Sequence, residues 1–343
     1  MTENELQPIS PSEAVEFYLD NRADELSEKS LTNQRYRLKS FVEWCETAGI
    51  ESMHQLGGRD LHKFRVWRSQ GNGKDYDPVS KVTLNGILQT LRVFLEFCAS
   101  IDAVESGLRE RVLIPDLEHD EETADEMVSS DYAEAVLEYM HRFEYASRDH
   151  VILGILWHTG MRLGSLRTLD VDDFDSDRQC LWIRHRPETG TPLKNKHAAE
   201  RAVAVGDSWV EIIQDYIDNN RHDVTDEHGR DPLITSSQGR LTQGPIRQTV
   251  YRWTRPCMIQ DCPHDKDPET CEYMQAKQAS GCPSSRSPHA VRRGSITKHL
   301  RDGTPEQIVS DRMNVARETL EQHYDERTEH EKMETRREFL NGV

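Results

Sequence analysis

The sequence lacks long apolar segments. Its 343 residues contain no run of about 18 apolar residues and no basic-then-apolar leader. These absences argue against a membrane-spanning helix and a secretory signal. We therefore expect an intracellular, cytoplasmic protein with no membrane partner. The length is sufficient for two domains, each with a core of its own.

Lysine is scarce, and a net positive charge is absent. The chain has 61 Asp and Glu against 43 Lys and Arg, and only 11 of these basic residues are lysines. This balance ordinarily argues against nucleic acid, which binds basic surfaces. An acid-rich, lysine-poor composition is also typical of proteins from salt-loving organisms, in which net charge reflects solvation rather than the ligand. Counterion release contributes less to DNA binding in high salt, so a nucleic-acid partner is not excluded.

Cysteine is unevenly distributed. Cys45, Cys98 and Cys180 stand singly in apolar surroundings and are expected to be buried. Four others lie within 26 residues, namely Cys257, Cys262, Cys271 and Cys282. Clustered cysteines in an intracellular chain favour a metal over disulfides. Four thiolates, or three with the His264 imidazole, would satisfy a structural zinc site, and four unrelated reduced cysteines are the alternative.

The first third of the chain has helical periodicity. Ser10-Pro-Ser-Glu13 has the spacing of a capping box, with proline at the first helical position. Apolar faces predict further helices over 30–48, with Gly49 as the stop, and over 58–70 and 79–100. Residues 1–114 are therefore predicted to form an all-helical domain.

An acidic stretch poor in apolar residues, 115–131, is predicted to be the linker to a second domain, 132–343. Helices are expected near 132–143, 148–159, 207–221 and 243–255. Residues 180–184 and 201–205 are expected to form two short strands joined by a long hairpin loop. The predicted fold class is mainly α, with a small β-hairpin sheet in an α+β second domain.

The second domain contains side chains suited to an anionic ligand. Arg162 follows a glycine break at a predicted helix start, where backbone N–H groups also attract anions, although an exposed arginine at a helix corner would look the same. His289 and Arg292 are three residues apart and would share one face of a helix. A lysine of the loop, Lys194 or Lys196, could reach such a site. Tyr324 offers a phenolic oxygen that becomes a nucleophile once it is deprotonated.

This ordered set resembles the tyrosine recombinase (phage integrase) family, most closely archaeal and haloarchaeal integrases. Thr159-Gly-Met-Arg162 is similar to the family's first arginine box, His289-x-x-Arg292 to the second, and Leu320-Glu-Gln-His-Tyr324 to the nucleophile box. Lys194 is the better match to the family's hairpin lysine. The resemblance covers the whole chain and implies a SAM-like core-binding domain before the linker and a catalytic domain after it. The cysteine-rich insert, 257–282, is not a general feature of the family.

The resemblance implies a site-specific recombinase or integrase of a mobile element that cleaves and rejoins DNA through a 3′-phosphotyrosyl intermediate. Tyr324 would be the nucleophile, Arg162 and Arg292 would bind the non-bridging oxygens, His289 would be the general base, and Lys194 would protonate the leaving oxygen. No cofactor is needed for this chemistry, and zinc would be structural.

The implied partner is double-stranded DNA at attachment sites, in the nucleoid. A homo-oligomer, a tetramer on synapsed DNA, would assemble through a C-terminal helix at 327–343, for which a solvated tail is the alternative. Five basic residues are candidate DNA contacts, although a solvated surface is the ordinary interpretation of each: Arg35, Lys39, Lys63, Arg293 and Arg312.

Two positions depart from the family pattern. Asn314 stands where a histidine is usual, and its amide can bond a phosphoryl oxygen without supplying charge. Ser165 stands where an acidic residue is often seen. The alternative functions are a nicking–closing topoisomerase, a DNA-binding regulator on a degenerate scaffold, and a zinc-binding interaction module.

Overall fold

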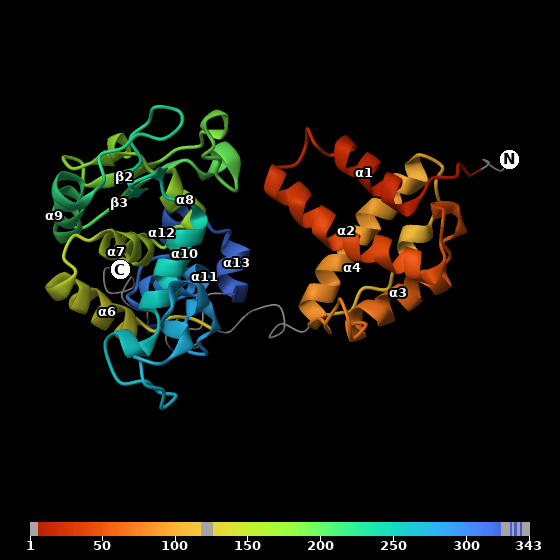
Figure 1. Ribbon diagram of the computed structural model, residues 1–343. Coiled ribbons are helices and arrows are strands. Elements are labelled where there is room, and N and C mark those ends of the chain that lie inside the picture. Colours follow the sequence, from red (N-terminus) through yellow and green to blue (C-terminus); the bar gives the residue numbers. More distant parts are fainter. Residues whose placement is uncertain (1–5, 118–125, 324–329, 331–332, 335–336, 338–343) are drawn as a thin grey trace. The chain divides into compact units, whose positions relative to one another are not determined.

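The chain divides into two compact units, Met1–Asp125 and Glu126–Val343, in the computed structural model (Figure 1). The structure describes residues 6–117, 126–323, 330, 333–334 and 337. The division falls inside the stretch that the sequence predicts as a linker. Within the described ranges, no helix is both long enough and apolar enough to cross a membrane.

The first unit is helical, and its α2, α3 and α4 helices lie within two residues of the ranges that the sequence predicts. Ser10 caps the first helix with a complete capping box, and Gly49 ends the second in the left-handed conformation (φ 71°). Its described residues form the α-helices α1 (Pro11–Asn21), α2 (Glu28–Ala48), α3 (Gly58–Gln70) and α4 (Lys81–Ser100), and the 3-10 turns η1 (Met53–Gln55) and η2 (Leu108–Arg111).

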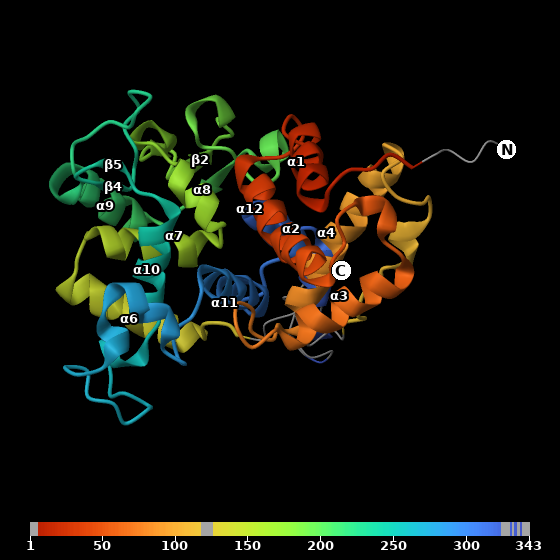
Figure 2. The ribbon, with the colours of Figure 1, turned by 45° about the vertical axis from the view of Figure 1, so that its right-hand side comes forward.

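The core of the first unit forms around α4, which packs against α1, α2 and α3 (Figure 2). Its apolar positions recur at helical spacing, so one face buries Leu88, Leu91 and Leu95 at no more than 1% exposure. Edge-to-face ring contacts join Tyr18 of α1 and Phe41 of α2 to Phe94 of α4.

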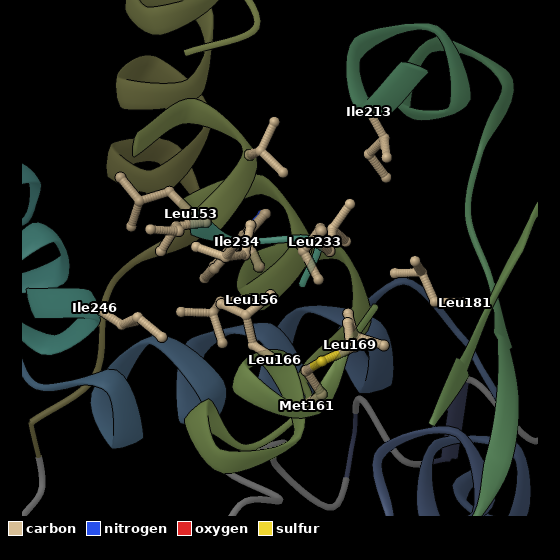
Figure 3. Close-up of a cluster of buried hydrophobic side chains, with 14 of the residues drawn as sticks. Leu153, Leu156, Met161, Leu166, Leu169, Leu181, Ile213, Leu233, Ile234 and Ile246 are labelled. Carbon is tan, nitrogen blue, oxygen red and sulfur yellow. The ribbon is translucent and has the colours of Figure 1, made fainter. Parts of the chain in front are cut away.

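The second unit is built around α7 (Arg148–Thr159), which is buried on nearly every side. The described residues of the unit also form α6 (Ser130–Phe143), α8 (Leu163–Thr168), α9 (Asp207–Asp215), α10 (Gln243–Trp253), α11 (Pro288–Arg301), α12 (Glu306–Met313) and α13 (Arg317–His323). Leu153 and Leu156 of α7 lie in the same apolar cluster as Ile234 and Ile246 (Figure 3). Because α7 also packs against α11, it fixes the helix that carries His289 and Arg292.

The sheets are small, as the sequence predicts. β1 (Phe174–Asp175), β2 (Cys180–Ile183) and β3 (Arg201–Ala204) form an antiparallel sheet in that order, with Leu181 opposite Val203. β4 (Thr235–Ser236) and β5 (Gly239–Arg240) form a second pair. Between β2 and β3 the predicted open loop contains two 3-10 turns, η4 (Pro187–Thr189) and η5 (Lys196–Ala199).

A separate apolar cluster ties α11, α12 and α13 together. It consists of Ile296, Leu300, Val309, Met313, Val315 and Leu320, all at most 7% exposed. Because this cluster joins α11, α12 and α13, it holds the helix that ends immediately before position 324 against the helix that carries the second arginine box.

Candidate active site

The first arginine box forms a tight turn between α7 and α8. Gly160 ends α7 in the left-handed conformation (φ 57°), and a Cβ placed on it would lie 2.6 Å from Sδ of Met313. Only glycine meets both conditions without strain. Arg162 then occupies the N-cap position of α8, and its Nη1 donates to the Asn314 carbonyl at 2.9 Å.

Arg292 is buried, and backbone carbonyls hold its guanidinium. The residue is 3% exposed. Its Nη1 donates to the carbonyls of Gly160 at 2.6 Å and Met313 at 2.8 Å, and its Nη2 donates to that of Asn314 at 3.4 Å. Carbonyls orient a guanidinium without cancelling its charge, so the group stays cationic and fixed in position.

Close helix packing explains the burial of Arg292. Ser287 caps α11 and Pro288 follows at its first position, so the helix starts one residue before His289. A Cβ at Gly294 would lie 2.0 Å from the Val128 carbonyl, so glycine is required for α11 to approach this closely. The Ser295 hydroxyl donates to the carbonyl of Trp157 at 2.5 Å, which attaches α11 to α7.

His289 lies one turn before Arg292 in α11. Partial burial lowers the pKa of its imidazole, and nearby positive charges lower it further, those of Arg292, Arg293, Arg162 and Lys194. The ring is therefore poised to be neutral near pH 7, as a general base must be. The same charges show that the predicted site residues of three separate segments act on one imidazole.

Lys194 is exposed at the end of the loop after β2, next to the buried Leu193. The Leu193 N–H donates to Nδ1 of His185 at 2.9 Å, and Asn195 Nδ2 donates to Oδ1 of Asn314 at 2.8 Å. These bonds attach the loop beside the arginines. The charge of Lys194 is among those that lower the pKa of His289, and the assignment of Lys194 as the loop lysine stays a prediction.

Asn314 has a backbone role that the sequence did not indicate. It ends α12 in the left-handed conformation (φ 52°, ψ 65°), which asparagine tolerates better than most residues. Its carbonyl accepts hydrogen bonds from both Arg162 and Arg292. Its amide bonds Asn195 and donates to the Ala198 carbonyl at 3.3 Å, so in this structure the side chain is engaged by the loop.

Arg201 joins the site although no motif pointed to it. Its Nε donates to the carbonyl of Arg312 at 2.7 Å and its Nη1 to that of Ala199 at 2.8 Å. Burial lowers the pKa of Arg201 to about 10, and the charges of Arg292, Arg162 and Arg312 contribute to that depression. The only signal in the sequence was an arginine that opens a predicted strand.

The predicted DNA contacts differ between the two units. Arg293 is 7% exposed, and Arg312 donates from Nη2 to the His158 carbonyl at 2.9 Å, with its pKa lowered by burial. In the first unit the cations are at the surface and paired with carboxylates: Arg35 with Glu16, Lys39 with Glu43 at 3.5 Å, and Lys63 with Asp60 at 3.1 Å. Such pairs contribute little stability, which leaves them free to exchange partners.

Tyr324 lies outside the described residues, as does most of the predicted assembly helix at 327–343. α13 (Arg317–His323) stands directly before Tyr324 in the sequence. Ser165, at the position of the second departure, is 8% exposed, and its N–H donates to the carbonyl of Arg162 at 2.8 Å. The structure thus assembles Arg162, Lys194, His289, Arg292 and Asn314, and Tyr324 remains a prediction.

The four clustered cysteines line one cavity. Its volume is about 170 Å³, and its walls include Cys257, Cys262, Cys271, Cys282 and His264. All four thiols are free. Nowhere in the described ranges do three or more His, Cys, Asp or Glu side chains form a group ready to hold a metal ion.

Comparison with known proteins identifies the family to which both units are similar. Residues 126–331 match the model of the phage integrase family, and residues 16–100 match that of the phage integrase N-terminal SAM-like domain. The tyrosine recombinase XerD of Mycobacterium tuberculosis is 23% identical over 319 residues, which cover 90% of this chain and 91% of that protein.

Solved structures show the same fold. A structure of the Tn1549 transposon integrase in complex with a circular intermediate DNA matches with a TM-score of 0.66 at 15% identity, over 96% of this chain and 99% of that one. A lambda integrase dimer bound to a COC′ core site matches with a TM-score of 0.59 at 11% identity, over 95% and 77%. These matches confirm the predicted family and fold class, and the chain belongs to the phage integrase family of tyrosine recombinases.

Proposed function

We propose that this protein is a site-specific recombinase that cleaves and rejoins double-stranded DNA through a 3′-phosphotyrosyl intermediate. The observation that carries the proposal is the cluster of guanidinium groups formed by Arg162, Arg292 and Arg201. Arg162 and Arg292 donate to the same carbonyl, that of Asn314, and burial together with the charges of Arg292, Arg162 and Arg312 lowers the pKa of Arg201 to about 10. An anion with several oxygens would relieve that repulsion, and a phosphodiester offers two non-bridging oxygens to such a cluster.

The proposed reaction uses only side chains of the protein. Tyr324 Oη forms a bond to the phosphorus as the bond from phosphorus to the 5′-oxygen breaks, and His289 accepts the phenolic proton. Lys194 supplies a proton to the leaving 5′-oxygen. Arg162 and Arg292 stabilise the charge that grows on the phosphoryl oxygens in the transition state. The 5′-hydroxyl of a second strand then reverses these steps, so neither a nucleotide nor another cofactor is consumed.

The fixed position of Arg292 supports this assignment. Its guanidinium is already bound to carbonyls of two segments, α7's end and α12's end, before any ligand arrives. A donor that needs no reorganisation stabilises developing charge more effectively than a mobile one. We also propose that strand exchange takes place in a tetramer on two synapsed attachment sites. The lambda integrase dimer on a core site supports assembly on DNA for that protein.

The test is to trap a covalent protein–DNA adduct. A nicked suicide duplex carrying a candidate attachment site, incubated at high potassium, should give an adduct with the wild type and none with Tyr324→Phe. Tyr36→Phe is the matched control, since Tyr36 is a 75% exposed tyrosine of the first unit. That variant should react like the wild type.

Two results would contradict the proposal. An adduct formed by Tyr324→Phe would mean that another residue is the nucleophile. Specific binding of the duplex by the wild type, with no adduct, would favour a DNA-binding regulator on a recombinase scaffold.

A further inference from the structure

The segment between α10 and α11, residues 256–287, has almost no apolar core. It contains three 3-10 turns and neither an α-helix nor a strand: η7 (Pro256–Met258), η8 (Glu272–Met274) and η9 (Ala276–Gly281). Ala279 and Cys282 are its only buried apolar side chains, in a segment that the structure describes completely. A segment with so little buried apolar surface usually needs another source of stability, such as a disulfide or a metal.

The two ends of this segment meet. The Thr254 hydroxyl donates to the carbonyl of Arg286 at 3.1 Å, and the Arg286 N–H donates to that hydroxyl at 2.8 Å. The Tyr132 hydroxyl donates to the carbonyl of Arg255 at 2.8 Å, which attaches the base of the segment to α6. The segment therefore forms a closed loop. It ends at Ser287, the N-cap of the helix that carries His289 and Arg292.

Four thiols come together inside this loop. Cys257, Cys262, Cys271 and Cys282 come from different parts of it, yet all four line the same cavity of about 170 Å³. Cys257 lies within electrostatic range of Cys262 and Cys282. None of the four forms a disulfide. Three other cysteines of the chain lie in apolar cores or in β2, so the gathering is confined to this segment.

A buried cation forms one wall of the same cavity. Arg255 is 1% exposed, and its guanidinium donates to the carbonyls of Tyr273 and Arg252 and contacts Sδ of Met258. Across the described residues it makes no ion pair with a carboxylate. Burying an unpaired cation is unfavourable unless an anionic partner forms nearby. Cys257, Cys282 and Cys271 all lie within electrostatic range of it.

We propose that Cys257, Cys262, Cys271 and Cys282 bind one Zn²⁺ ion as four thiolates, and that the ion fixes the connection that leads into α11. Each thiol gives up its proton to solvent on binding, and the resulting centre carries two negative charges beside Arg255. Four sulfur ligands in a tetrahedron favour zinc among the common divalent ions. Because no group in the described residues is ready to hold a metal, the thiols must close in, so binding and ordering of the segment are coupled.

His264 is the one competing ligand in the cavity. Its Nε2 is 2.9 Å from the Ser284 hydroxyl, and its ring is exposed. Cys282 is buried and Cys271 is half-buried, whereas the His264 ring is exposed, and this favours the all-thiolate set over three thiolates and an imidazole. His264→Ala should therefore keep the metal.

The test measures metal on the full-length protein and does not depend on DNA. Protein refolded with zinc under reducing conditions should hold one zinc per chain, released when the thiols are alkylated. Substitution with Co²⁺ should give the intense thiolate-to-cobalt absorption of a tetrahedral four-sulfur site. Cys271→Ser and Cys282→Ser should each weaken zinc binding by at least about tenfold. The matched control is Cys180→Ser in β2, which should still bind one equivalent.

Hydrogen exchange gives a second measurement, which uses only the wild-type protein and so does not depend on the folding of a variant. Removal of zinc from the wild-type protein should increase exchange at 256–287 while α4 in the first unit is unchanged. The proposal is overturned if wild-type protein binds no zinc tightly, if iron is found in its place, or if the four cysteines form disulfides under these conditions. Retention of full affinity by Cys271→Ser or Cys282→Ser would overturn the four-thiolate assignment.

The role of Arg255 can be tested in the same assay. Arg255→Gln removes the buried positive charge and should weaken zinc binding about tenfold or more, as is common for groups that support a metal's ligands. Arg252→Gln is the control, because Arg252 is partly exposed and pairs with Asp149 instead. Arg255→Lys should restore part of the affinity. Equal zinc affinity in Arg255→Gln and the wild type would refute the electrostatic role.

Discussion

The two units of this protein treat positive charge in opposite ways. In the first unit the cations at the predicted DNA-facing positions are exposed and paired with carboxylates on the same or a neighbouring helix, as Lys39 is with Glu43 and Lys63 with Asp60. In the second unit Arg292 and Arg293 are almost fully buried, and the guanidinium of Arg292 is bound to carbonyls.

The difference shows where charge serves the fold and where it serves a ligand. An exposed ion pair contributes about 0–1 kcal/mol and can be rearranged at little cost. Burying a charge costs several kcal/mol, and placing further guanidinium groups beside it adds repulsion. A stable fold has no need of such a cluster. The arrangement is understandable if the buried cluster binds a phosphate group, and the contrast can be tested in both units.

The largest effect is expected at Arg292. Arg292→Lys keeps the charge but cannot bond three carbonyls and a phosphate together, because an ammonium lacks the planar fork of a guanidinium. Adduct formation with the suicide duplex should slow by about 10²–10³-fold, the usual loss for one donor in such a site. The rate is measured by gel at saturating duplex.

The matched control for that variant is Arg301→Lys, an exposed arginine in the last turn of the same helix. It should react at close to the wild-type rate. Thermal unfolding of both variants separates loss of chemistry from loss of fold. If Arg292→Lys reacted normally, the buried cluster would be structural.

His289 should give the next largest effect, as a pH dependence. The pKa of His289 is lowered from its ordinary value, so the neutral imidazole dominates above that depressed pKa and the protonated form dominates below it. A general base works only when neutral. The cleavage rate should therefore fall as pH falls through a value below 6.5.

His289→Gln should lower the neutral-pH rate by about 10²-fold and remove this acidic limb. His228→Gln, at an exposed turn remote in sequence, should retain the wild-type profile. Persistence of the limb in His289→Gln would assign the titration to another group.

Asn314 tests whether the site needs a side chain or a backbone shape. The left-handed conformation and the carbonyl that accepts both arginines suggest that shape is what matters. Asn314→Gly should then cleave within about threefold of the wild type, since glycine adopts this conformation freely. Asn314→Val should lose about tenfold or more and unfold at a lower temperature, because left-handed backbone costs a β-branched residue about 1–2 kcal/mol. Equal losses in both variants would show that the amide itself contacts the phosphate.

Asn314 also shows which features of the site can be predicted from the sequence alone. The boxes around Arg162, His289 and Arg292 are local patterns, and a glycine stop or a serine cap is encoded in a few neighbouring residues, so these elements were predictable. The conformation of Asn314 depends on α12 ending beside α7 and the loop after β2, which are distant in sequence. A periodic pattern carries no such information.

Arg201 and the two-residue strands were missed for related reasons. Arg201 belongs to the site only because β3 runs beside Arg312, a contact between residues 111 apart. β1, β4 and β5 are two residues long, too short for alternation to be read. For the cysteine cluster the sequence indicated more than the structure contains. The spacing of the cysteines indicates a metal, whereas the described side chains form no ready-made group to hold one.

The smallest effects are expected in the first unit, and their sign is the informative part. If Lys39 and Lys63 leave their carboxylates to contact phosphates, Lys39→Gln and Lys63→Gln should each weaken duplex binding by a few fold and reduce the slope of log affinity against log salt by about 1. Glu43→Gln and Asp60→Asn should do the opposite and strengthen binding by a few fold, because each removes the competitor for one lysine. Lys74→Gln, at an exposed loop, is the control and should change neither quantity. Binding isotherms over a series of potassium concentrations measure both.

The carboxylate variants could instead weaken binding as the lysine variants do. These pairs would then be part of the surface that holds the first unit together. In that case the first unit would have no exchangeable positive charge to contrast with the fixed charge of the second unit.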